Sequence, residues 1–302
     1  MKFVFLRKAL CSLKRSMVAA LIAAVAAGGL WGPGVESVRA YVLQGPHILD
    51  LMARQLSGAK SLRVTQRVTL EESSMDTKQV VLDETLRFIF PERFRSDVKY
   101  DDNQRIMVDS KGQRLTVVDG EITDEPEGWF DRYKDLLLYN TPELLHKTLS
   151  KDGVDVETTS LGRFGDKVVY VIGARYPDES VSQLWVDMDQ FLPVRWLTVH
   201  PVSTTPGEQD RWEFVYSGWQ KVDGMFYPFR IETIHNGQIV RSVRVTRAEA
   251  NVAIDTASFD VEQMRSKYPV KAVTVPSEED RAVPGVEGVQ RAIDDFKRKF
   301  EP

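Results

Sequence analysis

FGDKVVYVIGARY (residues 164–176) opens the part of the chain that decides the fold, which runs from Phe164 to Glu249. Five further segments follow it: SQLWVDMD (182–189), LPVRWLTVHP (192–201), DRWEFVYSGWQKV (210–222), GMFYPFRIETIHNG (224–237) and QIVRSVRVTRAE (238–249). They are rich in β-branched and aromatic residues, and turn sequences such as Asp223-Gly224 and Asn236-Gly237 separate them. Closely spaced strands with short turns predict an antiparallel meander.

The residues before this meander predict more strands, interrupted by helices. A short helix is expected over 46–56, and strands over 62–70, 79–90, 93–98, 105–109 and 113–118. Helical spacing appears from Trp129 to Leu137 and again after Thr141, which is a suitable N-cap. The segment ASFDVEQM (257–264) reads as a last turn and an edge segment. The predicted fold class is α+β, mainly β: one curved antiparallel sheet with helices on one face.

Both ends of the chain are expected to lie outside this domain. Residues 1–40 have a basic start, an uncharged run over 17–30, and Val38 and Ala40 at the −3 and −1 positions, which is the pattern of a cleaved secretory signal. An uncleaved membrane anchor is the alternative, but glycines and Pro33 interrupt the apolar run. The domain then covers 41–268, a linker covers 269–285, and 286–302 form a C-terminal amphipathic helix.

Charge and cysteine content narrow the class of protein. The full chain has a net charge of −4 and one cysteine, Cys11. Without residues 1–40, which hold six basic residues and one acidic residue, 34 basic side chains remain against 43 acidic ones, a net charge of −9. An acidic exported chain is a poor candidate for binding nucleic acid or anionic lipid surfaces. Because the mature chain has no cysteine, its core must be large enough to be stable without disulfides.

The sequence carries no motif of catalysis or of metal binding. Four histidines are present: His47, His146, His200 and His235. None is placed at metal-ligand spacing from another histidine or from a carboxylate. Asp187 and Asp189 could hold calcium or act as acid and base, but aspartates between two strands are more often turn formers. We therefore expect no catalytic residue, no metal and no cofactor, and a protein that is not an enzyme.

Aromatic residues are the marked excess of the meander. Trp212, Phe214 and Tyr216 alternate onto one face of a strand, and Phe229 and Ile231 share a face of the next. Large rings bury much apolar area, so an ordinary sheet core explains them. The competing explanation is the apolar wall of a ligand cavity in a partly open barrel.

The order of these segments resembles the LolA/LolB-like superfamily of outer-membrane lipoprotein-sorting proteins, which are periplasmic carriers. The resemblance rests on the helix ILDLMARQL (48–56), the strand LRVTQRVTL (62–70), the helical insert, FLPVRWLTVHP (191–201), WEFVYSGWQKVDGMFYPFRIETIHNG (212–237) and VAIDTASFDV (252–261). It covers about 46–264; the tail over 269–302 has no counterpart in the simple carriers.

The resemblance implies a half-open barrel whose helices cover an apolar cavity for acyl chains. The cavity residues that it implies are Leu86, Phe88, Trp196, Phe214, Tyr216, Phe229 and Ile231. The lid residues that it implies are Leu49, Met52, Trp129, Phe130 and Leu137.

Two functional hypotheses follow. The first is a periplasmic carrier that holds lipid or lipoprotein acyl chains, with a membrane protein of a lipid or lipoprotein export pathway as a further partner. The second is a periplasmic sensor or interaction module of the same fold, which regulates a partner protein through its C-terminal helix. The apolar stripe of that helix consists of Val286, Val289, Ile293, Phe296 and Phe300.

Overall fold

The computed structural model describes residues 42–71, 80–100, 103–123, 128–202 and 208–270, which all belong to one compact unit. The strands are β1 (Ser61–Leu70), β2 (Val80–Ile89), β3 (Arg93–Tyr100), β4 (Asn103–Ser110), β5 (Gln113–Val118), β6 (Glu121–Thr123), β7 (Thr159–Phe164), β8 (Lys167–Ile172), β9 (Gln183–Asp187), β10 (Pro193–Pro201), β11 (Gln209–Val222), β12 (Met225–His235) and β13 (Gln238–Ala250). The helices are α2 (Gly45–Leu56), η1 (Trp129–Lys134), α3 (Asp135–Leu138), α4 (Pro142–Lys151), η2 (Thr256–Phe259) and α5 (Val261–Lys267).

All of these strands form a single antiparallel sheet. Its order is β6-β5-β4-β3-β2-β1-β13-β12-β11-β10-β9-β8-β7, so each strand up to β6 and each strand from β7 pairs with its sequence neighbours. The first and last strands join the two halves, because β1 pairs with β13 and Leu62 lies opposite Ala250. The predicted single antiparallel sheet is confirmed, and β6 and β7 are its end strands. At the β6 end, Ile122 forms a bridge with Val270.

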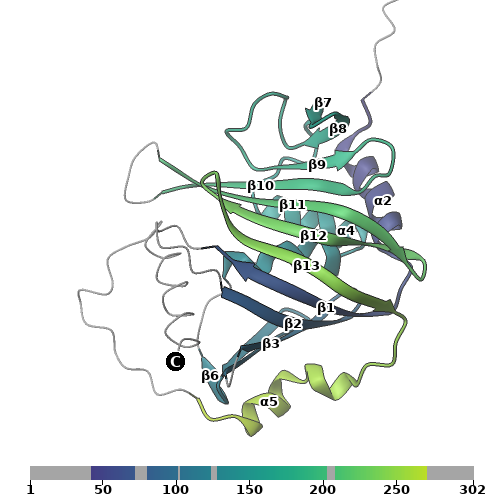
Figure 1. Ribbon diagram of the computed structural model, residues 1–302. Coiled ribbons are helices and arrows are strands. Elements are labelled where there is room, and N and C mark those ends of the chain that lie inside the picture. Colours follow the sequence, from purple (N-terminus) through teal and green to yellow (C-terminus); the bar gives the residue numbers. More distant parts are fainter. Residues whose placement is uncertain (1–41, 72–79, 101–102, 124–127, 203–207, 271–302) are drawn as a thin grey trace, which may run out of the picture. The chain divides into compact units, whose positions relative to one another are not determined.

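One face of the sheet, which we call the inner face, is covered by α2, η1, α3 and α4. Figure 1 shows α2 and α4 lying against the strands β10 to β13. On β11 the buried residues Trp212, Phe214 and Tyr216 alternate with more exposed neighbours, as period-two side-chain alternation requires. Buried residues of α2, η1, α3 and α4 pack with the sheet in one large apolar core.

The opposite, outer face is covered near β3 to β5 by η2 and α5 (Figure 1). There Phe259, Val261 and Met264 pack on Ile106 and Val108 of β4. The expectation of an edge segment over 257–264 was wrong for this reason: the apolar residues of a short helix pack on the sheet surface. The Asp260 side chain caps that helix by accepting a hydrogen bond from the Gln263 amide at 3.0 Å.

Local sequence fixes the two helices that matter most for the inner face. The Thr141 hydroxyl accepts a hydrogen bond from the Leu144 amide at 3.3 Å and caps α4, as the sequence predicts. Gly45 begins α2, where a Cβ atom would lie 1.9 Å from the Val156 carbonyl oxygen. Only glycine lets α2 come this close to the loop that follows α4.

Candidate functional site

The predicted cavity residues lie together on the inner face. Leu86, Phe88, Trp196 and Phe214 have no exposed surface, and Tyr216 and Ile231 are each 1% exposed. Phe229 is half-buried and packs against the same core. A side chain without accessible surface borders no space large enough for a water molecule. The apolar wall is therefore filled by neighbouring side chains in this conformation.

The predicted lid residues supply much of that filling. Leu49 and Met52 of α2 and Leu137 of α3 are buried in the same apolar core as the wall. Trp129 and Phe130 of η1 are half-buried and contact another ring of the inner face: Trp129 stacks on Trp212 with ring centroids 5.6 Å apart, and Phe130 meets it edge-on at 5.8 Å. The lid segment and the wall are thus in direct contact.

A buried polar cluster beneath η1 was not predicted from the sequence. At its centre the Arg241 guanidinium lies 3.0 Å from the Glu84 carboxylate, and both residues are almost fully buried. Glu84 also accepts hydrogen bonds from Gln66, at 2.7 Å, and from the Ser96 hydroxyl. Because a charge pair is costly to bury in an apolar core, the segments that this pair contacts need to be identified.

This cluster holds η1 against the sheet. Arg241 donates to the Phe130 carbonyl oxygen at 2.6 Å and lies over the Tyr133 ring at 4.6 Å. Gln66 donates to the Tyr133 hydroxyl at 3.2 Å, and the Tyr216 hydroxyl donates to the Tyr133 carbonyl oxygen at 2.8 Å. Burial is the main cause that raises the pKa of Tyr133, so its hydroxyl stays neutral. Strands β1, β11 and β13 therefore fix one short segment through polar bonds.

A second ion pair anchors the same segment. Arg105 of β4 lies 2.8 Å from the buried Asp131 carboxylate. Burial alone would raise the pKa of Asp131, but the charge and hydrogen bond of Arg105, with Arg241 and Lys134, lower it from 3.8 to about 2. The folded protein thus binds the charged form of Asp131 more favourably than the unfolded chain does.

This ion pair gives a pH-dependent prediction. Because the folded pKa is lower than the unfolded pKa, its stabilisation is present above pH 4 and is lost as the pH falls towards 2. Asp131→Asn is expected to lower the free energy of unfolding by about 2 kcal/mol at pH 7. Urea unfolding from pH 7 to pH 2 should show the difference from wild type shrinking below about pH 4. Asp83→Asn, whose carboxylate is 79% exposed, is the control and should change little; an Asp131→Asn difference that is constant with pH would contradict the assignment.

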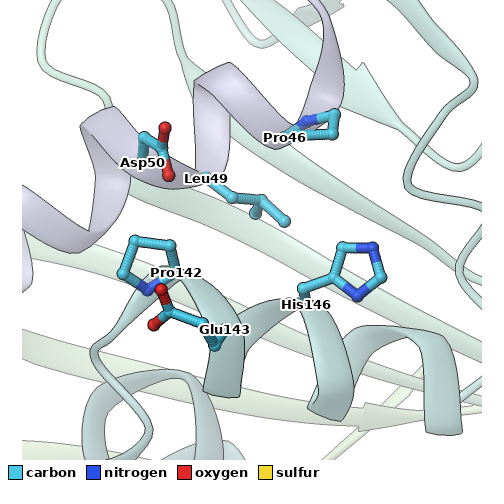
Figure 2. A pocket seen from close by; sticks show the side chains of 6 residues that line it. All are labelled: Pro46, Leu49, Asp50, Pro142, Glu143 and His146. Carbon is cyan, nitrogen blue, oxygen red and sulfur yellow. The ribbon is translucent and has the colours of Figure 1, made fainter.

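A pocket of about 380 Å³ lies at the seam between α2 and α4 (Figure 2). Pro46, Leu49 and Asp50 line it from α2; Pro142, Glu143 and His146 line it from α4. Figure 2 shows the Leu49 side chain pointing into the space between the two helices. Leu49 is also part of the main core, so it separates the pocket from the apolar interior.

The seam is held differently from η1. Within the described ranges, no side chain of α2 is hydrogen-bonded or ion-paired to a side chain of α4; at the pocket Glu143 and His146 are exposed and Asp50 is half-buried. The α4 helix is tied at its ends instead: Asn140 donates to the Leu56 carbonyl oxygen at 3.1 Å, and Arg132 lies 2.5 Å from Asp152. The contact between α2 and α4 at the pocket is therefore apolar, and the Asn140–Leu56 hydrogen bond joins the C-terminal end of α2 to the residues just before α4.

The other sequence candidates have structural roles. His47 and His146 are exposed, whereas His235 Nε2 donates a 2.6 Å hydrogen bond to the Asp210 carboxylate, and its ring stacks on Trp212 at 4.2 Å. The Asp187 carboxylate accepts from the amides of Asp189 and Gln190, at 3.0 and 2.9 Å, as expected of a turn former. In the part of the chain that the structure describes, no three His, Cys, Asp or Glu side chains are grouped to hold a metal ion.

Several predictions concern residues outside the described ranges. These are the signal segment over 1–40, most of the linker and the partner-binding stripe of Val286, Val289, Ile293, Phe296 and Phe300. Among the helices within the described ranges, none combines the length and apolar character needed to span a bilayer.

Comparison with known proteins finds similarity only at the level of structure. No family model matches the sequence, and no curated protein matches it. An outer membrane lipoprotein-sorting protein domain from Vibrio parahaemolyticus is similar, with 8% identity and a TM-score of 0.48 over 73% of this chain and 97% of that chain. A DUF1329 family protein from Desulfovibrio piger has 10% identity and a TM-score of 0.48 over 73% of this chain and 98% of that chain. A LolA superfamily protein from Nitrosomonas europaea has 12% identity and a TM-score of 0.44 over 74% of this chain and 100% of that chain. At identities of 8–12%, these likenesses are of backbone arrangement alone.

Proposed function

We propose that this protein is a periplasmic, non-catalytic carrier that binds lipid or lipoprotein acyl chains against the inner face of its sheet. The observation that carries the proposal is the inner face itself. It is a continuous apolar wall made by distant strands, and short helices cover it instead of a second sheet. An acyl chain that replaces those helices would bury the same wall.

Such an exchange is favourable only if the acyl chain buries as much apolar surface as the part of the cover that it displaces. Each CH₂ group removed from water contributes about 0.8 kcal/mol, so a long acyl chain can replace the packing of several leucines. The leucines of the cover, such as Leu145 and Leu149 of α4, are fully buried in the closed form. Displacing them without a ligand would expose apolar surface, which keeps the unliganded protein closed.

The helix that we expect to move is α4. Its contact with α2 is apolar, and the seam between the two helices already contains a pocket whose floor is Leu49. In contrast, polar bonds from three strands fix η1 to the sheet. Separation of α4 from α2 would open the wall beneath them while η1 stays in place.

The composition agrees with a soluble role in an exported location. The pattern over 1–40 is that of a secretory signal, and the remaining chain has a net charge of −9. This charge disfavours nucleic acid and anionic membrane surfaces as partners. A carrier of this kind needs no metal, cofactor or nucleophile, since it changes no covalent bond in its ligand.

Uptake of a fluorescent fatty-acid analogue tests the proposal. The purified exported chain is expected to bind the analogue saturably with about one site, and unlabelled acyl lipids should displace it. Mass spectrometry of protein purified from an exporting host should also detect acyl lipid. Absence of both saturable uptake and co-purified lipid would refute the carrier function.

A further inference from the structure

Strand β10 carries three unusual residues on the inner face. Trp196, Thr198 and His200 follow one another at every second position, and each has a buried polar atom without a hydrogen-bond partner. These atoms are Trp196 Nε1, Thr198 Oγ1 and His200 Nε2. Trp196 and Thr198 have no exposed surface. We call these three residues the β10 row.

Unpaired buried polar atoms are rare in folded proteins, because a hydrogen bond to water is lost and none replaces it. Three such atoms at alternate positions of one strand indicate a surface that can bind a polar ligand. Valine in place of Thr198 would have nearly the same shape and would leave no hydroxyl buried without a partner. The polar atoms therefore lower the stability of the closed form, and a ligand that pairs with them would offset this loss.

We propose that the β10 row binds the oxygen-bearing head of the acylated ligand, through neutral ester and hydroxyl oxygens. The inference rests on the proposed carrier function and identifies the ligand class of that site. An indole N–H can only donate, so Trp196 needs an oxygen acceptor. Thr198 and His200 can each donate or accept. Ester carbonyls and hydroxyls satisfy all three.

The length of the row indicates a head with several oxygens. Residues at i and i+4 of a strand are roughly 13 Å apart, so Trp196 and His200 cannot share one atom. The row also continues into the apolar wall, because Trp196 contacts Phe214 with ring centroids 5.3 Å apart. A head on the row would thus leave its acyl chain on the wall.

The charges near the row favour a neutral head over a phosphate. Burial lowers the pKa of His200, and the charge of Arg132 adds to this, while the charges of Asp152 and Asp210 act against it. Asp210 stands opposite His200 in the pairing of β10 with β11. Arg132 lies over the Trp196 ring at 5.8 Å but is already paired with Asp152 at 2.5 Å. A phosphate would therefore meet two carboxylates and a guanidinium that is already neutralised.

The row lies beneath side chains of η1 and is linked to α4 through them. Trp129 lies 4.9 Å from the His200 ring and Arg132 lies 5.8 Å from the Trp196 ring, and Arg132 is paired with Asp152 directly after α4. Moving α4 would uncover the wall and break the Arg132–Asp152 pair, and the side chains of Arg132 and Trp129 would then have to turn away from the row. The inference is consistent with the opening that we propose above.

The test compares three ligands that share one acyl-chain length: a monoacylglycerol, the corresponding long-chain alcohol and a lysophosphatidate. Each competes with the fluorescent fatty-acid analogue on the exported chain. Wild type is expected to prefer the monoacylglycerol over the other two. Thr198→Val should reduce the preference for the monoacylglycerol over the alcohol by roughly three- to tenfold, the effect of one hydrogen bond. Trp196→Phe should reduce the same preference, and Thr198→Ser, which keeps the hydroxyl, should retain it.

Stability gives a second readout and a matched control. Thr198→Val should raise the melting temperature by about 2–4 °C, because an unpaired buried hydroxyl is removed. Tyr227→Phe also removes a buried hydroxyl without a partner, on β12 outside the row, and should not alter the ligand preference.

If wild type binds the analogue but Thr198→Val keeps the full preference, the row is not the head site and the carrier function stands. If lysophosphatidate binds best, the neutral-head inference is wrong. If no acyl ligand binds, both the inference and the carrier function fail.

Discussion

Replacing Arg241 with methionine is expected to lower the free energy of unfolding by about 3–5 kcal/mol, because the Glu84 carboxylate would stay buried without its charge partner. The two groups lie 3.0 Å apart, and their side chains are 5% and 2% exposed. Arg241→Met also removes the donor to the Phe130 carbonyl oxygen, so η1 should loosen. Urea unfolding at pH 7 measures the change.

A second substitution separates the loss of the pair from the loss of packing. Glu84→Gln removes the charge and keeps one oxygen, which can accept from Gln66, while its amide NH2 can donate to the Ser96 hydroxyl oxygen. The double variant Glu84→Gln/Arg241→Met is therefore expected to recover a large part of the lost stability. Arg247→Met is the surface control: that side chain is 71% exposed, and its pair with Glu249 should contribute at most about 1 kcal/mol. Equal effects of Arg241→Met and Arg247→Met would contradict the role of the polar cluster.

Cross-linking α2 to α4 is expected to weaken acyl binding strongly. Asp50 and Glu143 line the seam pocket from opposite helices, so Asp50→Cys/Glu143→Cys places two thiols across it (Figure 2). A cleavable bis-maleimide should lower the affinity for the fluorescent analogue by about tenfold or more, because apparent affinity falls with the fraction of protein able to open. Cleavage of the linker should restore it.

The same double-cysteine protein treated with a monofunctional maleimide is the control. It carries the same modification without the bridge, so it should bind as the untreated protein does. Cys11, the one native cysteine, is replaced by serine where the N-terminal segment is retained. Unchanged binding in the bridged protein would show that the ligand reaches the wall by a route other than the seam.

The sheet was predictable because its signals are local. Alternation of apolar and polar residues marks the strands, and Asp223-Gly224 and Asn236-Gly237 mark the tight turns between them. Asp223 and Asn236 indeed have positive φ angles of 41° and 48°. Such turn residues fix strand order without any knowledge of tertiary contacts.

The polar cluster was missed because its members come from distant strands. Glu84 and Arg241 are separated by 157 residues in the chain. They meet because β1 pairs with β2, which carries Glu84, on one side and with β13, which carries Arg241, on the other. A signal was nonetheless present: Glu84 stands at an inner position between Leu82 and Leu86, where alternation calls for an apolar residue. A charged residue in the buried register of a strand predicts a buried partner.

The state of the wall could not be predicted either. The sequence identified the aromatic face but left open whether helices fill it, because that depends on how closely α2 and α4 approach the sheet. Gly45 permits the close approach of α2, and nothing in its local sequence distinguishes it from an ordinary helix-start glycine. Side chains of the cover occupy the wall in the closed form, so the carrier function depends on opening.

A crystal structure with a terminally brominated acyl chain tests the central claim most directly. Anomalous scattering locates the bromine independently of the protein density. The carrier function predicts a bromine peak on the inner face, in contact with Phe88, Phe214 or Tyr216, with α4 displaced from α2. A bromine peak on the outer face, or a bound chain with the inner face still closed, would contradict it.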